Sequence, residues 1–260
     1  MGPVLVTGGT GTLGRAVVAR LRDGGHEVWV ASRRPAGVRV VADLSSGAGI
    51  DGAVAGADAI VHCATTSGAA DVEITRTLVD GARRAGTPHL VFISIVGVDR
   101  IPLGYYRAKL AAERLVEESG LGWTVLRATQ FHDLVVWLWR MQRRSPVIVS
   151  PGSTSIQPVD VRDVAARLVE LATGPPAGRV PDLGGPEVRA AADLARSYLR
   201  ATGRYAAVLP VPFPGAVAAA YRRGHHLTVP RPGITFEEFL AERGATGGAG
   251  RCSAPAWSRT

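Results

Sequence analysis

Tyr105 and Lys109 are the residues whose types and spacing point most directly to chemistry. They lie four positions apart, which places both side chains on one face of a helix. An ammonium group beside a phenol stabilises the phenolate and lowers the pKa of the tyrosine from its usual value of about 10. Such a tyrosine can donate or accept a proton at neutral pH. The spacing therefore predicts an acid–base pair, with Tyr106 as the adjacent alternative for the phenol.

Lys109 is the single lysine among 30 basic side chains, so its presence is hard to attribute to composition. Arginine places its charge differently and does not give up its proton, so it is not an equivalent choice at this position. The alternative interpretation is an exposed lysine on a helix that also carries several glutamates. Ser94, which ends an apolar run 11 residues before Tyr105, is the third candidate of this group.

A glycine-rich turn, Thr7-Gly-Gly-Thr-Gly-Thr-Leu-Gly14, lies between the first apolar run and the first amphipathic segment. Glycines spaced three apart let phosphate oxygens approach the backbone amides, and the partial positive charge of the following helix N-terminus favours the anion. The turn therefore predicts a site for the pyrophosphate of a dinucleotide. The alternative is an ordinary turn in a chain with 32 glycines. The predicted cofactor contacts in the turn are Gly8, Thr10, Gly11, Thr12, Leu13 and Gly14.

The run Ala31-Ser32-Arg33-Arg34 ends the second apolar strand, about 20 residues after the turn. A site that prefers NAD places a carboxylate here to accept a hydrogen bond from the ribose 2′-hydroxyl. In this chain Ser32 can donate a hydrogen bond, and Arg33 and Arg34 can bind a 2′-phosphate through charged planar groups. We therefore expect NADP(H) rather than NAD(H). The alternative is a pair of solvated arginines.

Two further strand ends would approach the adenine and its ribose in a doubly wound sheet. Asp43 and Leu44 follow the third expected strand, and Cys63, Ala64 and Thr65 follow the fourth. Asp43 fits equally well as a turn or capping residue. Cys63 is expected to be a small buried apolar residue rather than a nucleophile, because no basic neighbour in the sequence would lower the pKa of its thiol.

Short apolar runs alternate with amphipathic segments from residue 4 to about residue 130. Strands that are apolar on both faces and joined by helices are typical of a parallel sheet covered on both sides. We therefore predict an α/β fold with a doubly wound parallel sheet, whose ligands bind at the carboxyl ends of the strands. The expected strands are residues 4–6, 27–31, 38–41, 57–62, 89–94 and 123–127, and the expected helices are residues 13–22, 72–85 and 106–118.

The alternation predicts a dinucleotide-binding domain over residues 1–130 and a smaller substrate-covering lobe over residues 131–243, with a helix that begins after an N-cap at Asp160. Residues 244–260 are small, polar and glycine-rich, so a disordered tail is expected there. Gln130 and His132 follow the sixth expected strand and are predicted to line the substrate pocket. The alternative for His132 is a surface position at a helix N-terminus.

The 30 basic and 22 acidic side chains give a net charge of +8 and a pI near 10.4. The arginines are scattered as pairs without a basic block, so the charge does not predict a nucleic-acid partner. The two cysteines lie far apart, which excludes a disulfide framework and a zinc spacing, and no metal site is expected. No signal peptide and no apolar stretch of about 20 residues are present, so we expect a cytoplasmic protein without a membrane contact.

These motifs resemble the short-chain dehydrogenase/reductase superfamily, and more narrowly its atypical NmrA-like NAD(P)H-binding branch, which is related to extended epimerase/dehydratase-type members. The likeness extends to about residue 243. It implies a Rossmann-type fold and the binding of NADP(H) or NAD(H). The matching runs are Thr7 to Gly14, Ser94-Ile-Val-Gly97, Tyr105-x-x-x-Lys109 and Gln157-Pro-Val-Asp-Val161.

The resemblance also implies roles for the candidate residues. Tyr105 would protonate a carbonyl oxygen while a hydride arrives from the nicotinamide, Lys109 would hold the nicotinamide ribose, and Ser94 would hydrogen-bond the substrate oxygen. Ser94 lies slightly closer to Tyr105 than is usual in the superfamily, and it lacks the doubled serine of many extended members. A plain hydroxyl at the end of a strand is therefore the alternative for Ser94.

Together these features predict an NADPH-dependent oxidoreductase that transfers hydride to a small carbonyl or quinone substrate. One alternative is a non-catalytic NADP(H)-sensing regulator that binds a partner protein. Another is a nucleotide-sugar epimerase or dehydratase, for which the short second lobe leaves little room. A monomer and a homodimer are both compatible with the sequence.

Overall fold

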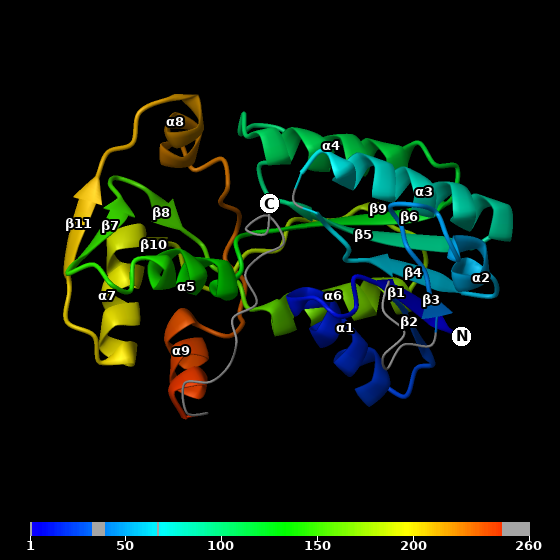
Figure 1. Ribbon diagram of the computed structural model, residues 1–260, viewed down its shortest axis with the longest axis horizontal. Coiled ribbons are helices and arrows are strands. Elements are labelled where there is room, and N and C mark those ends of the chain that lie inside the picture. Colours follow the sequence, from blue (N-terminus) through cyan, green and yellow to red (C-terminus); the bar gives the residue numbers. More distant parts are fainter. Residues whose placement is uncertain (1, 33–39, 67, 246–260) are drawn as a thin grey trace.

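A sheet of seven parallel strands runs through the larger of two lobes in the computed structural model, which describes residues 2–32, 40–66 and 68–245 (Figure 1). Its strands are β1 (Val4–Thr7), β2 (Val28–Ser32), β3 (Val40–Val41), β4 (Ala59–His62), β5 (His89–Ile95), β6 (Gly122–Ala128) and β9 (Gly178–Arg179). The order across the sheet is β3-β2-β1-β4-β5-β6-β9, with every pairing parallel. The chain thus winds outward in both directions from β1 and β4, which confirms the predicted doubly wound sheet.

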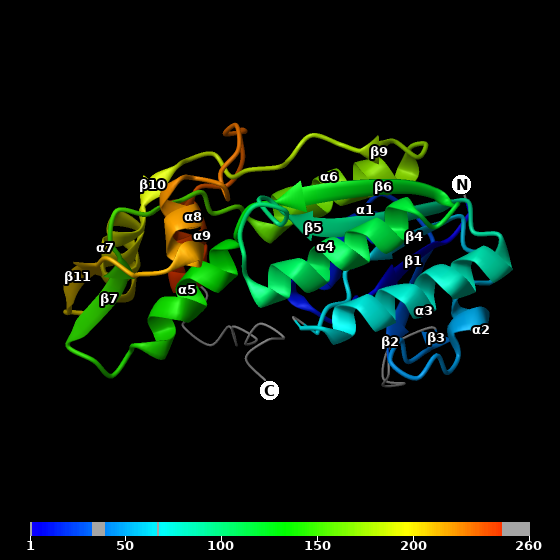
Figure 2. The same ribbon diagram turned by 90° about the horizontal axis from the view of Figure 1, so that it is seen from above.

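Helices cover both faces of the sheet, because successive side chains of its strands are apolar on both sides. Val4 and Val6 of β1 pack against one pair of helices, whereas Leu5 between them packs against the helices of the opposite face. The first face carries α1 (Thr12–Asp23) and α6 (Val161–Thr173), and the second carries α2 (Ile50–Val54), α3 (Ala70–Ala85) and α4 (Gly104–Glu117). Figure 2 shows the carboxyl ends of β5 and β6 pointing toward the smaller lobe.

The boundary predicted at residue 130 does not match this architecture. Helix α6 and strand β9 follow residue 130 in the sequence but belong to the larger lobe, where β9 pairs with β6 and α6 lies beside α1. The physical reason is the apolar face of α6: Val164, Leu168 and Leu171 are buried and complete the core under β1 and α1. The predicted N-cap of this helix is confirmed, since the Asp160 carboxylate accepts a hydrogen bond from the Arg162 amide at 2.8 Å.

The smaller lobe has its own core around Trp139, Tyr198 and Phe236. Its helices are α5 (His132–Met141), α7 (Ala191–Thr202), α8 (Ala216–Arg222) and α9 (Phe236–Ala245). Its strands form two pairs: β7 (Val147–Pro151) with β11 (Ala207–Val211), and β8 (Ser155–Ile156) with β10 (Arg189–Ala190). Helix α9 ends at Ala245, so the predicted disordered tail lies almost entirely outside the described residues.

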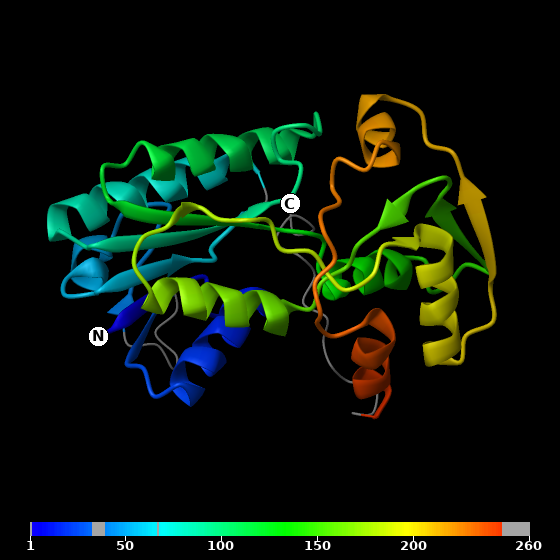
Figure 3. The same cartoon turned by 180° about the vertical axis from the view of Figure 1, so that it is seen from behind.

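The segment between α8 and α9 passes between the two lobes, as Figure 3 shows from behind. The Gln157 side chain accepts a hydrogen bond from the Thr228 amide at 2.9 Å and donates one to the Gly185 carbonyl at 2.9 Å. Asp163 of α6 accepts a hydrogen bond from the Ile234 amide at 2.9 Å. These contacts attach the returning chain to both lobes. In the described part of the chain, no helix is long and apolar enough to cross a membrane.

Candidate functional site

The glycine-rich turn follows β1 and packs against the backbone of Cys63 and Ala64, just beyond β4, too closely for side chains. Gly8 has a φ of +68°, and a Cβ atom there would lie 2.6 Å from the Ala64 amide nitrogen. A Cβ atom on Gly14 would lie 2.1 Å from the Gly8 carbonyl oxygen. A Cβ atom on Gly11 would lie 3.2 Å from the same oxygen. These glycines therefore leave the backbone of the turn bare at the carboxyl end of β1.

Helix α1 begins at this turn without a side-chain cap and without an acidic residue in its first turn. The first amides of a helix have no partners within the helix, and the helix dipole places partial positive charge there. A pyrophosphate group fits both features, because it supplies acceptor oxygens and negative charge. Leu13 packs in the core, so only its amide is available to a ligand, while Thr10 is exposed and Thr12 lines a cavity.

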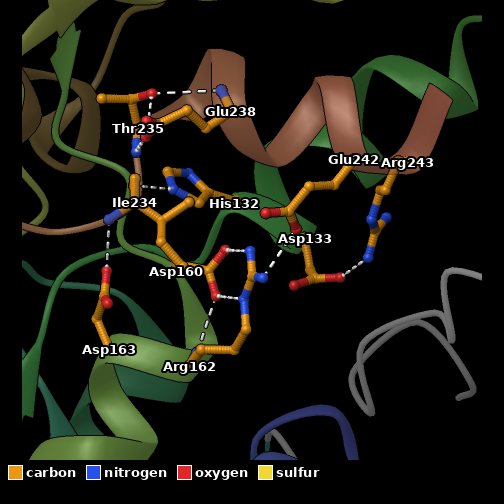
Figure 4. A network of polar contacts seen from close by, with 10 residues as sticks. All are labelled: His132, Asp133, Asp160, Arg162, Asp163, Ile234, Thr235, Glu238, Glu242 and Arg243. Atoms are coloured by element: carbon orange, nitrogen blue, oxygen red, sulfur yellow. Dashed lines mark hydrogen bonds and ion pairs between the residues drawn. The ribbon is translucent and has the colours of Figure 1, made fainter. Parts of the chain in front are cut away.

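That cavity has a volume of about 220 Å³ and lies between the start of α1 and the smaller lobe. Arg162 and Arg243 line it, and both are held by carboxylates (Figure 4). Arg162 forms two hydrogen bonds with Asp160, at 2.9 and 3.0 Å, and an ion pair with Glu242 at 2.8 Å. Arg243 pairs with Asp133. The charged residues around this cavity come from α5, α6 and α9. The sequence therefore gave no indication that they lie together beside Thr12.

The structure describes only some of the residues that we predicted to lie near the adenine and its ribose. Ser32 ends β2, whereas Arg33 and Arg34 lie outside the described residues. Asp43 forms a turn: its carboxylate accepts a hydrogen bond from the Ser45 amide at 2.9 Å, as the turn alternative predicts. Leu44 is half-buried and packs against the core cluster beneath α2 and α3.

Cys63 follows β4 and is half-buried, packed against the core of the larger lobe. Burial raises the pKa of Cys63 to about 12, and the opposing influence of Lys109 is smaller. A thiolate is therefore disfavoured, as expected for a small apolar residue. Ala64 and Thr65 come next, with the Ala64 backbone against Gly8 and the Thr65 hydroxyl 3.4 Å from the Tyr105 hydroxyl.

Tyr105 and Lys109 both lie on α4, which begins at Gly104. Tyr105 is half-buried, and its ring packs near the cluster around Tyr106. Only 4% of Lys109 is exposed, and its ammonium nitrogen lies 4.4 Å from the centroid of the Phe92 ring. The alternative of a solvated lysine is therefore wrong: Lys109 points inward toward β4 and β5.

Tyr106, the competing phenol, points into the packing between the lobes. It is 5% exposed, and its hydroxyl lies 3.0 Å from the hydroxyl of Tyr221 on α8. Burial, together with the neighbouring Tyr221, raises the pKa of Tyr106 well above its ordinary value. Gln130 lies near the same hydroxyl, but its side-chain amide is buried without a hydrogen-bond partner among the described residues. The Tyr106 hydroxyl is therefore occupied by a contact with the smaller lobe, whereas the Tyr105 hydroxyl lies beside Thr65, just beyond β4.

Ser94 lies in β5 opposite Arg127 of β6 and is 3% exposed. Its hydroxyl and that of Thr129, just beyond β6, are buried without a hydrogen-bond partner in the described part of the chain. Buried hydroxyls are usually satisfied, so two orphaned ones at the carboxyl ends of neighbouring strands fit a site that receives polar ligand atoms.

His132 does not line a substrate pocket, and it is not on the surface either. It is fully buried at the start of α5, where its Nε2 lies 3.0 Å from the Ile234 carbonyl oxygen. Its ring packs against Phe236 and Phe239, with centroids 5.5 and 5.0 Å away. Burial lowers the pKa of His132, so the neutral ring serves as part of the lobe core.

Asp71 is a candidate site residue that sequence reasoning missed. It is 1% exposed at the second position of α3, and its carboxylate accepts hydrogen bonds from the Thr65 hydroxyl at 2.6 Å and from the amide and hydroxyl of Thr66 at 2.5 and 2.7 Å. The helix was expected to begin only at Val72. The sequence did contain an indication of this role: an acidic residue, Asp71, stands near the start of an expected helix, and two threonines, Thr65 and Thr66, follow the preceding strand.

The chain matches the NAD(P)H-binding family over residues 8–175. It is 32% identical over 258 residues to the (4-alkanoyl-5-oxo-2,5-dihydrofuran-3-yl)methyl phosphate reductase of Streptomyces griseus, covering 94% of this chain and 88% of that one. It is 26% identical to the NAD(P)H azoreductase of Xenophilus azovorans, covering 95% and 99% of the two chains.

Two solved structures share the fold. An NADPH-dependent quinone oxidoreductase from Escherichia coli, complexed with NADPH, superposes with a TM-score of 0.81 at 18% identity, covering 92% of this chain and 99% of that one. A nucleoside-diphosphate-sugar epimerase from Staphylococcus aureus superposes with a TM-score of 0.77 at 19% identity, covering 93% and 100%. The family match, the sequence relatives, the doubly wound sheet and the bare glycine turn all agree. The chain therefore belongs to the NAD(P)H-binding family.

Proposed function

We propose that the protein is an NADPH-dependent reductase that transfers hydride to a small carbonyl or quinone substrate, with Tyr105 as the general acid. One observation carries the proposal: Tyr105 and Lys109 share a helix beside the carboxyl ends of β4 and β5. The hydroxyl of the competing Tyr106 is instead hydrogen-bonded to the hydroxyl of Tyr221. A phenol with a buried ammonium on the same helix face suits proton donation to a substrate oxygen.

The chain's own residues would divide the work as follows. Gly8, Gly11 and Gly14 leave room for the dinucleotide, and the start of α1 stabilises its phosphates. When bound, the nicotinamide supplies the hydride that reaches the substrate carbon. Tyr105 donates the proton that the substrate oxygen requires as negative charge develops on it, and the Lys109 ammonium stabilises the phenolate that remains.

Ser94 would supply a second hydrogen bond to the substrate oxygen. Its buried hydroxyl has no partner within the described residues, so it is available without breaking an existing bond. Gln130 lies close to Tyr106 and would form part of the pocket wall. We omit His132 from the proposal, because its ring packs against Phe236 and Phe239 and its Nε2 lies beside the Ile234 carbonyl oxygen.

The preference for NADPH over NADH rests on Ser32, Arg33 and Arg34. A carboxylate is absent from this strand end, and a guanidinium can pair with the 2′-phosphate through two hydrogen bonds. We expect Arg33→Ala to raise the KM for NADPH about tenfold or more while leaving the KM for NADH unchanged. Steady-state kinetics with both cofactors measure this, and an unchanged KM for NADPH would remove Arg33 from the site.

The names of two sequence relatives support a reductase over the alternatives. Both relatives described above are reductases by name, whereas the epimerase shares only the fold. The test is NADPH consumption against ketones, aldehydes, quinones and an acyl-oxo-dihydrofuranyl methyl phosphate of the class named for the Streptomyces griseus protein. Turnover that disappears in Tyr105→Phe supports the proposal. Tight binding of NADPH and NADP+ with no turnover on any compound would instead favour the sensing regulator.

A further inference from the structure

Asp71 holds a carboxylate inside the larger lobe without an arginine or lysine at hydrogen-bond distance among the described residues. Its three donors, the Thr65 hydroxyl and the amide and hydroxyl of Thr66, lie between 2.5 and 2.7 Å away. The Asp71 carbonyl also accepts a hydrogen bond from the Thr75 hydroxyl at 2.7 Å. Hydrogen bonds to a carboxylate are roughly twice as strong as neutral ones, so these contacts fix the chain after β4.

The segment that Asp71 fixes is the one that contacts the proposed general acid. The Thr65 hydroxyl donates to Asp71 and also lies 3.4 Å from the Tyr105 hydroxyl. With its proton directed to the carboxylate, the Thr65 oxygen presents its lone pairs to the phenol. Asp71 therefore sets the position and the polarity of a group beside Tyr105.

Asp71 and Lys109 are both buried, with 1% and 4% of their surfaces exposed, on the neighbouring helices α3 and α4. Little water therefore screens the charge of one from the charge of the other. Burial lowers the pKa of Lys109, and the strongest opposing influence is the charge of Asp71 on α3, ahead of Cys63 beyond β4 and Glu113 on α4 itself. Glu113 is already engaged by a buried arginine. His62 of β4 stays neutral, since burial and Lys109 together lower the pKa of His62 to about 3.

We propose that Asp71 is a positioning residue of this site, which holds Thr65 against the Tyr105 phenol and keeps the buried Lys109 ammonium charged. This inference rests on the proposed function for its catalytic meaning. Its electrostatic part concerns only residues of the chain and can be measured without cofactor or substrate.

The first experiment uses Lys109 as the single lysine of the chain. Lysine labelled with carbon-13 at Cε gives one side-chain NMR signal, whose pH dependence reports the protonation of Lys109. We expect Asp71→Asn to move this titration to lower pH by about one unit. Asp71→Glu, which keeps the charge, should titrate closer to the wild type. Asp80→Asn, an exposed aspartate of the same helix, should leave the titration unchanged. A wild-type titration in Asp71→Asn would overturn the proposal.

The second experiment measures turnover. In Asp71→Asn, kcat should fall about tenfold, with the KM for NADPH within about twofold of the wild type, and the alkaline loss of activity should begin at lower pH. Thr65→Val removes the hydroxyl beside Tyr105 and should lower kcat without moving the Lys109 signal. An unchanged kcat in Thr65→Val would overturn positioning through Thr65. If the wild type has no turnover, the proposed function fails, and the NMR titration still decides the role of Asp71.

Discussion

Arg127 and Glu113 show how single residues hold the candidate acid–base pair in place. Arg127 of β6 and Glu113 of α4 are 4% and 1% exposed, and the Arg127 Nε lies 3.1 Å from each carboxylate oxygen of Glu113. The Arg127 Nη2 donates a further bond at 2.5 Å. The pair fixes α4 against the sheet one helical turn beyond Lys109. Removing one member of a buried ion pair is strongly destabilising, because the remaining charge loses its buried partner. Without the Glu113 charge, Arg127 would keep only its ion pair with the partly exposed Asp99, at 3.1 Å.

We therefore predict that Glu113→Gln lowers the free energy of unfolding by about 3–5 kcal/mol. Urea denaturation at neutral pH measures the change. Glu118→Gln replaces an exposed glutamate just beyond the same helix and should change the free energy of unfolding by less than about 0.5 kcal/mol. Equal stability of the two variants would show that the buried pair contributes little.

Some residues of the candidate site could be predicted from the sequence, and others could not. Tyr105 and Lys109 were found because a spacing of four on one helix is visible in the sequence. The role of Glu113 was not visible, because its partner Arg127 lies on β6. Asp71 was missed because the helix was expected to begin one residue after it. His132 was misplaced because a histidine at the start of a helix gives no sign of the phenylalanines that cover it.

At the scale of elements, the turn between β1 and α1 combines two requirements in a few residues. The turn must pass close to the backbone that follows β4, and it must leave the amides at the start of α1 open. Glycine meets both, so the motif was readable from the sequence with its strand and helix. The cavity beside Thr12 was not, since α5, α6 and α9 approach it only in the folded chain.

At the scale of this turn, we predict that Gly14→Ala weakens the binding of NADPH. Its methyl group would lie 2.1 Å from the Gly8 carbonyl oxygen, so the turn must move and the affinity for NADPH should fall about tenfold or more. Gly52→Ala makes the same change in α2, where a Cβ atom meets nothing within 4 Å, and should leave the affinity unchanged. Titration calorimetry with NADPH compares the variants. Wild-type affinity in Gly14→Ala would argue against a pyrophosphate at this turn.

For the whole molecule, the doubly wound sheet followed from the apolar runs, while the division into lobes did not. A parallel sheet needs both faces covered, and the sequence shows apolar strands and amphipathic helices in alternation. The return of α6 and β9 to the larger lobe depends on which apolar surfaces meet. The fold also buries four histidines as neutral rings, since burial lowers the pKa of each: His62, His89, His132 and His226.

These histidines predict that stability falls in acid. A histidine in the unfolded chain has a pKa of about 6.5, so below this pH it binds a proton that the buried histidine in the folded chain does not bind. The free energy of unfolding therefore decreases as the pH falls. For His62 this loss continues to about pH 3, at up to about 1.4 kcal/mol per pH unit. Urea denaturation between pH 7 and pH 4 should show a shallower slope in His62→Asn, and His26→Asn is the control. An equal slope in His62→Asn would contradict this account.

The central claim is that Tyr105 gives the proton during reduction. The most direct measurement is the rate of a single turnover, followed by the loss of NADPH absorbance after NADPH-loaded protein is mixed with a limiting amount of a substrate found in the panel. Tyr105→Phe should slow this step by about 10²–10⁴-fold, because a general acid contributes on that scale. Tyr106→Phe should stay within about threefold of the wild type, since its hydroxyl bonds to Tyr221. A wild-type rate in Tyr105→Phe would contradict the claim.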